Sequence, residues 1–416
     1  MLPKMTNSYS RYGRIWDVLA IIFVIWLFAW SLEKLKEPTQ LPPIYGERWS
    51  ITSYTDFATL MAGQRFYEDG FTTHYFLPNV SVGYQEFSRG WPYYNVPQVS
   101  DNSAAYVVRV GSLPAVINGL LRHIGIDDLL AFYKLAALSS VIALMFWYAI
   151  ASLLYGRITA LLSLIYIGTS IVFLGLMEGL AGYSYDFLLA FGAVIAFLLA
   201  ERVLAARRWI ALAYSIAWLL TLLQAFNSLG FLFWLQAFFL GYLWIHHGRP
   251  FKAWRPLLFL TSASIIGLSI HLTLVGWALG GFRSMLQALP SVLGIDTAEF
   301  HMDPFLGWSG RMDLLRVDLI GIVLLLALTL GIIIKLRQTL PTEVLSNQWA
   351  QWRLLLVFLV GGVSFIRLTS ESTVPIPEIP LRLLLPFTGL LLGFSIVMCF
   401  RYLKHADRWR WQFQAL

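Results

Sequence analysis

The feature that most constrains this chain is a series of continuously apolar segments, each close to the length that crosses a lipid bilayer. A hydrocarbon core of roughly 30 Å takes about 20 helical residues to cross, whereas barrel strands are shorter and alternate apolar with polar residues. Because these segments do not alternate, they predict helices. Only 13% of the residues are charged, against about 25% in a typical soluble domain. The sequence therefore predicts an all-α integral membrane protein, a bundle of about ten transmembrane helices.

The predicted spans make up one membrane domain over residues 1–416. They lie near 16–34, 129–154, 158–177, 183–202, 209–227, 230–246, 256–279, 317–335, 353–369 and 382–402.

The formal net charge is +7, and the basic residues lie at the ends of these spans rather than in one patch. Every second connection is short and basic, as the positive-inside rule requires of the cytoplasmic side. We therefore expect a multi-pass protein of the cell (inner) membrane with both termini in the cytoplasm, contacting membrane lipids and no nucleic acid. The single cysteine, Cys399, excludes an intrachain disulfide.

Long connections occur only on the outer side, which indicates that this side carries the function. The largest is residues 35–128, directly after the first span, and a second outer loop covers 280–316. Within the first loop, 55–70 and 107–124 have helical periodicity. Both are expected to be interfacial helices lying along the membrane. Asp56 falls in the first turn of the earlier helix, where the helix dipole alone favours a carboxylate.

An ordered set of short motifs resembles the GT-C superfamily of membrane glycosyltransferases that use a polyprenyl-phosphate sugar. The stretch from Thr55-Asp56-Phe57 to Asp69-Gly70-Phe71 is similar to that family's acidic opening of the first outer loop. Tyr106 to Pro114, which includes Arg109, is similar to the segment before its second interfacial helix, without the usual Tyr-Pro-Pro run. The stretch Tyr183-Ser184-Tyr185-Asp186-Phe187-Leu188-Leu189 resembles its acidic start of a middle span. The stretch Arg382-Leu383-Leu384-Leu385-Pro386-Phe387 resembles its Arg-aromatic-Leu-Leu-Pro-Phe segment, with Leu383 where an aromatic residue is common.

The resemblance implies transfer of a sugar from a polyprenyl-phosphate donor to a lipid, glycan or protein acceptor, with inversion at the anomeric carbon. It also implies that Asp56 is the family's catalytic acidic residue. An inverting transfer needs one base near the acceptor hydroxyl, and a carboxylate can serve. The phosphate leaving group is already a stable anion, so no strong acid is required.

The donor phosphate needs cationic or hydrogen-bonding partners, and arginine binds phosphate oxygens in pairs. The predicted substrate-binding residues on the outer side are Tyr106, Arg109, Asp186, His301, Arg311, Arg367 and Arg382. Asp186 is expected either to orient the acceptor or to hold a divalent cation, the one cofactor considered. For Arg382, the structural alternative is snorkelling of the side chain to the lipid headgroups or an ion pair with Glu371 or Glu378.

Two other classes of protein share many spans with such an enzyme. An outer-leaflet glycan polymerase or ligase typically carries its largest loop late in the chain, whereas here it follows the first span. A transporter or lipid flippase often shows paired halves with broken helices in matching positions. The sequence shows no such repeat, and a transporter leaves the long first loop unexplained.

Overall fold

The computed structural model describes residues 11–35, 53–77, 112–177, 179–180, 183–247, 254–278, 280–283, 285–286, 319–336, 342–368 and 381–414. Within these ranges the chain is helical and forms no strand. The helices are α1 (Arg11–Lys34), α2 (Ser53–Asp69), α4 (Leu113–His123), α5 (Leu129–Tyr155), α6 (Arg157–Gly168), α7 (Ile171–Leu176), α8 (Tyr183–Leu198), the π-helix η2 (Leu199–Val203), α9 (Arg207–Ala225), α10 (Leu229–His247), α11 (Trp254–Ala278), α14 (Leu319–Leu336), α15 (Thr342–Leu368) and α17 (Leu385–Gln414).

Each predicted span coincides with helix, but the expected count of ten is not confirmed. Six helices of the described chain are long and apolar enough to cross a membrane, namely Arg14–Lys34, Leu129–Tyr155, Arg207–Ala225, Leu229–His246, Trp254–Ala278 and Leu385–Lys404. The third predicted span is divided, because α6 ends at Gly168 and α7 begins at Ile171. The fourth is shortened, because α8 passes into the π-helix η2 after Leu198.

The centre of the bundle is organised around Trp147 of α5, whose side chain is fully buried. Its indole N–H donates to Ser163 Oγ of α6 at 2.9 Å. Its ring centroid lies 4.9 Å from that of Phe191 in α8 and 5.8 Å from that of Phe358 in α15. In lipid, helices associate through such close packing and hydrogen bonds rather than through a hydrophobic driving force. One side chain therefore joins four helices of the bundle.

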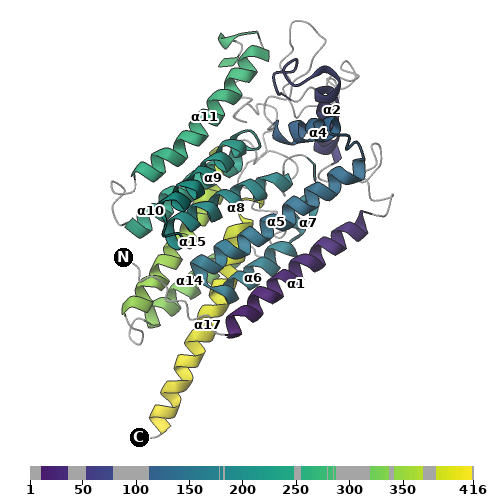
Figure 1. Ribbon diagram of the computed structural model, residues 1–416. Helices are drawn as coiled ribbons and strands as arrows, with labels where there is room; N and C mark the ends of the chain where they lie inside the picture. The colour runs from purple at the N-terminus through teal and green to yellow at the C-terminus, as the bar shows by residue number, and fades with distance from the viewer. Residues whose placement is uncertain are drawn as a thin grey trace.

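The helices α2 and α4 form a separate pair, which we call the α2/α4 lobe. The lobe lies over the end of the bundle at which α1 stops and α5 starts (Figure 1). The two helices approach closely at Gly63 and Gly119, where a side chain would collide with Asn118 and Phe66 respectively. The helix prediction for both segments is confirmed, with α2 beginning at Ser53 and α4 at Leu113. Their placement in a membrane interface is not confirmed.

Small apolar clusters attach this lobe to the bundle. Leu60 of α2 and Leu121 of α4 pack against a cluster that includes Leu35 and Phe132. After α2, the turn over 71–77 ends at Leu77, which is buried against the end of α11. The part of the 35–128 loop that the structure describes therefore covers one end of the bundle. Most of the 280–316 loop lies outside the described residues.

Candidate functional site

Asp186 and Arg382, predicted from two separate motifs, meet in a buried ion pair. Asp186 lies in the first turn of α8, where the helix dipole favours a carboxylate. Arg382 lies in the turn immediately before α17. Arg382 Nη2 is 3.0 Å from Asp186 Oδ2, and the two side chains are 2% and 1% exposed. The structure thus joins α8 to the segment that starts α17 through two opposite charges in the interior.

Two amide side chains also donate to the Asp186 carboxylate. Gln224 Nε2, from the last turn of α9, donates to Asp186 Oδ1 at 2.7 Å. Asn227 Nδ2, from the turn between α9 and α10, donates to the same oxygen at 2.7 Å. The guanidinium carbon of Arg382 lies 5.9 Å from the ring centroid of Phe231 in α10. Every partner donates toward the carboxylate, an arrangement that suits its ionised form because that form only accepts.

The start of α4 is hydrogen-bonded to the same turn. The Leu113 backbone N–H donates to the Phe226 carbonyl at 3.2 Å, and Phe226 directly precedes Asn227. The α2/α4 lobe is therefore in contact with the turn between α9 and α10, which contributes Asn227 to the surroundings of Asp186. We call the set of Asp186, Gln224, Asn227 and Arg382, with the start of α4 beside it, the Asp186 site.

The remaining predicted residues are only partly located. Asp56 lies in the first turn of α2 and Arg367 in the last turn of α15, but neither side chain belongs to the described part of the structure. Tyr106 and Arg109 precede α4 and fall outside the described residues, as do His301 and Arg311. Glu371 and Glu378, the alternative partners of Arg382, also fall outside them. The roles of these residues stay predictions.

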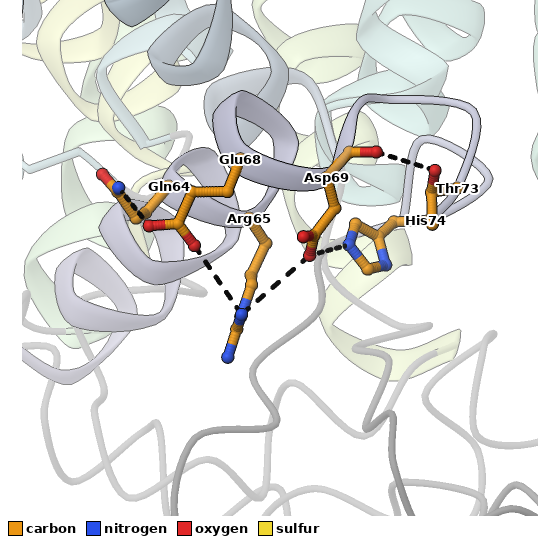
Figure 2. Close-up of polar contacts among 6 residues, drawn as sticks. All are labelled: Gln64, Arg65, Glu68, Asp69, Thr73 and His74. Atoms are coloured by element: carbon orange, nitrogen blue, oxygen red, sulfur yellow. Dashed lines mark hydrogen bonds and ion pairs between the residues drawn. The ribbon is translucent and has the colours of Figure 1, made fainter.

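A second polar cluster, at the end of α2, was not singled out from the sequence (Figure 2). His74 Nε2 lies 2.9 Å from Asp69 Oδ2, and Arg65 Nη1 lies 3.9 Å from the same oxygen. Thr73 Oγ1 donates to the Asp69 carbonyl at 2.8 Å. A carboxylate at a helix C-terminus is disfavoured by the dipole, and the Arg65 cation and the contact with His74 offset that effect. The cluster stabilises the turn over 71–77, whose last residue, Leu77, packs against the end of α11.

The divalent cation considered above stays a prediction. Among the residues that the structure describes, no three His, Cys, Asp or Glu side chains lie close enough together to hold a metal ion. In the Asp186 site a single carboxylate faces a guanidinium and two amides. That donor set suits an ion pair better than a hard cation, which prefers several oxygen ligands.

Comparisons with known proteins add a distant structural likeness. Neither a protein-family model nor a curated protein sequence matches the chain. Among solved structures, the chain is similar to the archaeal oligosaccharyltransferase AglB from Archaeoglobus fulgidus, in complex with an inhibitory peptide and a dolichol-phosphate, at 12% identity and a TM-score of 0.49. The match covers 95% of this chain and 52% of that one, so the chain spans about half the length of that protein. A likeness this distant carries no argument about activity.

Proposed function

We propose that this protein is an inverting glycosyltransferase that moves a sugar from a polyprenyl-phosphate-linked donor to an acceptor hydroxyl. The reaction takes place at the membrane face that carries the α2/α4 lobe, and the acceptor is a lipid, a glycan or a protein. The observation that carries the proposal is the meeting of Asp186 and Arg382 beside the start of α4. Three segments that resemble glycosyltransferase motifs are far apart in the sequence and lie together in the fold.

Asp56 is the proposed base, as the family resemblance implies. The acceptor hydroxyl attacks the anomeric carbon while the bond from that carbon to the phosphate oxygen breaks, and the phosphate leaves as a stable anion. The hydroxyl proton passes to the carboxylate of Asp56, which also holds the hydroxyl in line with the leaving group. Asp56 is placed in the first turn of a helix of the lobe, so its backbone position is fixed by a regular element.

Arg382 is proposed to supply positive charge beside the donor phosphate, with Asp186 as a positioning residue. A guanidinium carries five N–H groups in a rigid fork, and Asp186 orients that fork through Nη2. Tyr106 and Arg109, just before α4, are proposed to contact the donor from the lobe. Arg367, His301 and Arg311 are further proposed cationic or hydrogen-bonding contacts of the same substrate.

The test compares two substitutions in one helix. We expect Asp56→Asn to lower the rate of sugar transfer by about 10²–10⁴-fold, while binding of a synthetic polyprenyl-phosphate sugar persists. Asp69→Asn removes the same charge at the other end of α2 and should leave the transfer rate within a few-fold of wild type. A panel of hexose and pentose donors provides the substrate. Full activity in the Asp56→Asn variant would remove the proposed base.

The phosphate role of Arg382 is tested separately by donor binding. Arg382→Ala should weaken binding of the polyprenyl-phosphate sugar but not of the corresponding uncharged polyprenol. Protein from a single well-folded peak in size-exclusion chromatography is required, because the substitution leaves Asp186 buried without its cation. Unchanged affinity for the charged donor would move the phosphate site away from Arg382.

A further inference from the structure

At the end of the bundle opposite the α2/α4 lobe, Arg202 is held entirely by neutral groups. It lies in η2, at the far end of the segment that begins near Asp186. Its Nε donates to Tyr242 Oη at 2.7 Å and its Nη1 to the Leu153 carbonyl at 2.8 Å. Its Nη2 lies 2.9 Å from Nε2 of His246. Three contacts from α5 and α10 therefore fix the orientation of the guanidinium.

The neighbouring carboxylate does not neutralise this cation. Glu201 precedes Arg202 in the chain, but Glu201 accepts a hydrogen bond from the Tyr214 hydroxyl of α9. In the part of the chain that the structure describes, no carboxylate lies within ion-pair distance of Arg202. π-helical turns are rare and are frequent at functional sites. Here the turn directs two consecutive charged side chains to different helices, Glu201 to Tyr214 of α9 and Arg202 to Tyr242 of α10.

Further cations lie where α9 and α11 begin. Arg207 and Arg208 are exposed in the first turn of α9, and Arg255 is exposed in the first turn of α11. The Arg208 guanidinium lies 5.4 Å from the ring centroid of Trp209, and that of Arg255 lies 5.6 Å from the ring centroid of Trp254. Both tryptophans are 49% exposed. Exposed tryptophan beside arginine is typical of the headgroup layer of a membrane.

The two helix starts are level with each other. Trp218 Nε1 of α9 donates to Ser262 Oγ of α11 at 3.0 Å. Deeper in the bundle, Gly267 of α11 lies against Ala225 of α9. This register places the first turns of α9 and α11 side by side, so the cations of both helices face the same layer of headgroups.

We propose that this end of the bundle is a binding site for the phosphate of an anionic phospholipid. Arg202 is the oriented cation at the inner edge of the site, and Arg208 and Arg255 bind the headgroup from the membrane surface. The positive-inside rule explains an excess of basic residues. It does not explain a guanidinium that is fixed by three neutral acceptors while its adjacent carboxylate bonds elsewhere. Basic clusters at this level of a membrane protein bind anionic headgroups.

The experiment uses the full-length protein in nanodiscs of phosphatidylcholine with increasing amounts of phosphatidylglycerol. Thermal unfolding is followed by tryptophan fluorescence, and retained lipid is counted by native mass spectrometry. We expect phosphatidylglycerol to raise the unfolding midpoint of the wild type, because a ligand of the folded state stabilises it. The double variant Arg208→Gln/Arg255→Gln should bind phosphatidylglycerol roughly 30-fold more weakly. The control Arg65→Gln/Lys134→Gln removes the same charge near the opposite end and should respond like the wild type.

Arg202→Gln tests the oriented cation itself. It should abolish the response to phosphatidylglycerol while unfolding in pure phosphatidylcholine remains cooperative. Inorganic phosphate added to phosphatidylcholine nanodiscs is the second arm. A phosphate-induced shift that depends on Arg202 would identify a soluble anion as the ligand and overturn the assignment to a lipid. Equal responses to the two lipids, or equal losses in the control variant, would also overturn the proposal.

Discussion

The ion pair between Asp186 and Arg382 gives the sharpest prediction about stability. Asp186→Asn keeps Oδ1 as an acceptor for Gln224 and Asn227 but turns an amide NH₂ toward the Arg382 guanidinium. Both side chains are at most 2% exposed, so the remaining cation cannot regain water. Breaking a buried pair by removing one partner costs about 3–5 kcal/mol. We expect a loss of that size in the free energy of unfolding.

A second variant separates the charge from the packing. Asp186→Leu/Arg382→Met removes both charges and keeps the volume close to that of the native pair. Apolar replacement of a whole buried pair is often neutral or stabilising by about 1–4 kcal/mol. The double variant should therefore be at least about as stable as the wild type. Under the proposed function, it should still lose sugar transfer, because the cation beside the donor phosphate is gone.

The control is a pair of the same chemistry near the surface. Asp17 Oδ1 accepts from Arg157 Nε at 3.0 Å, with the two side chains 37% and 30% exposed. Exposed pairs contribute about 0–1 kcal/mol, so Asp17→Asn should cost far less than Asp186→Asn. Chemical unfolding in mixed detergent micelles measures each difference. Equal, small losses in the two single variants would refute the reasoning, since burial could then not govern the energy of the Asp186 pair.

Two further predictions concern the α2/α4 lobe. Gly63→Ala places a methyl group against the Asn118 side chain and should destabilise the lobe, which limited proteolysis of the lobe detects. The control is Gly331→Ala in α14, where a methyl group meets nothing within 4 Å. It should be neutral or stabilise the protein by up to about 1 kcal/mol. His74→Ala removes the 2.9 Å contact with Asp69. It should increase hydrogen exchange in the turn over 71–77 while leaving exchange in the bundle unchanged, and unaltered exchange in that turn would count against the anchoring role.

The helices could be predicted from the sequence because bilayer length and apolarity are local properties. The break between α6 and α7 could not, because it depends on the residues 169–170 within a segment that is otherwise apolar. The π-helix at Arg202 could not be predicted either, because Tyr242 and Leu153, which Arg202 contacts there, belong to other helices. These features shorten the helices of the third and fourth predicted spans. The helix of the eighth, Ile320–Leu336, is also among the shorter apolar helices of the described chain.

For the candidate site, the sequence identified Asp186 and Arg382 singly but not as partners. Each carries a charge at the edge of an apolar segment, and both segments were expected to reach the outer face. Opposite charges inside a membrane bundle tend to pair with one another, a signal that would have suggested the ion pair. The amides of Gln224 and Asn227 gave no such signal, because a polar pair at a tight turn usually only faces water.

The central claim is that the end of the bundle under the α2/α4 lobe binds a polyprenyl-phosphate sugar. A cryo-electron microscopy map of the protein in nanodiscs with a saturating, non-transferable analogue of that donor tests it directly. We predict density for the phosphate beside the turn that carries Arg382, with the prenyl chain running along the bundle toward the lipid. Donor density confined to the Arg202 end, or none at the lobe under saturating donor, would contradict the proposal.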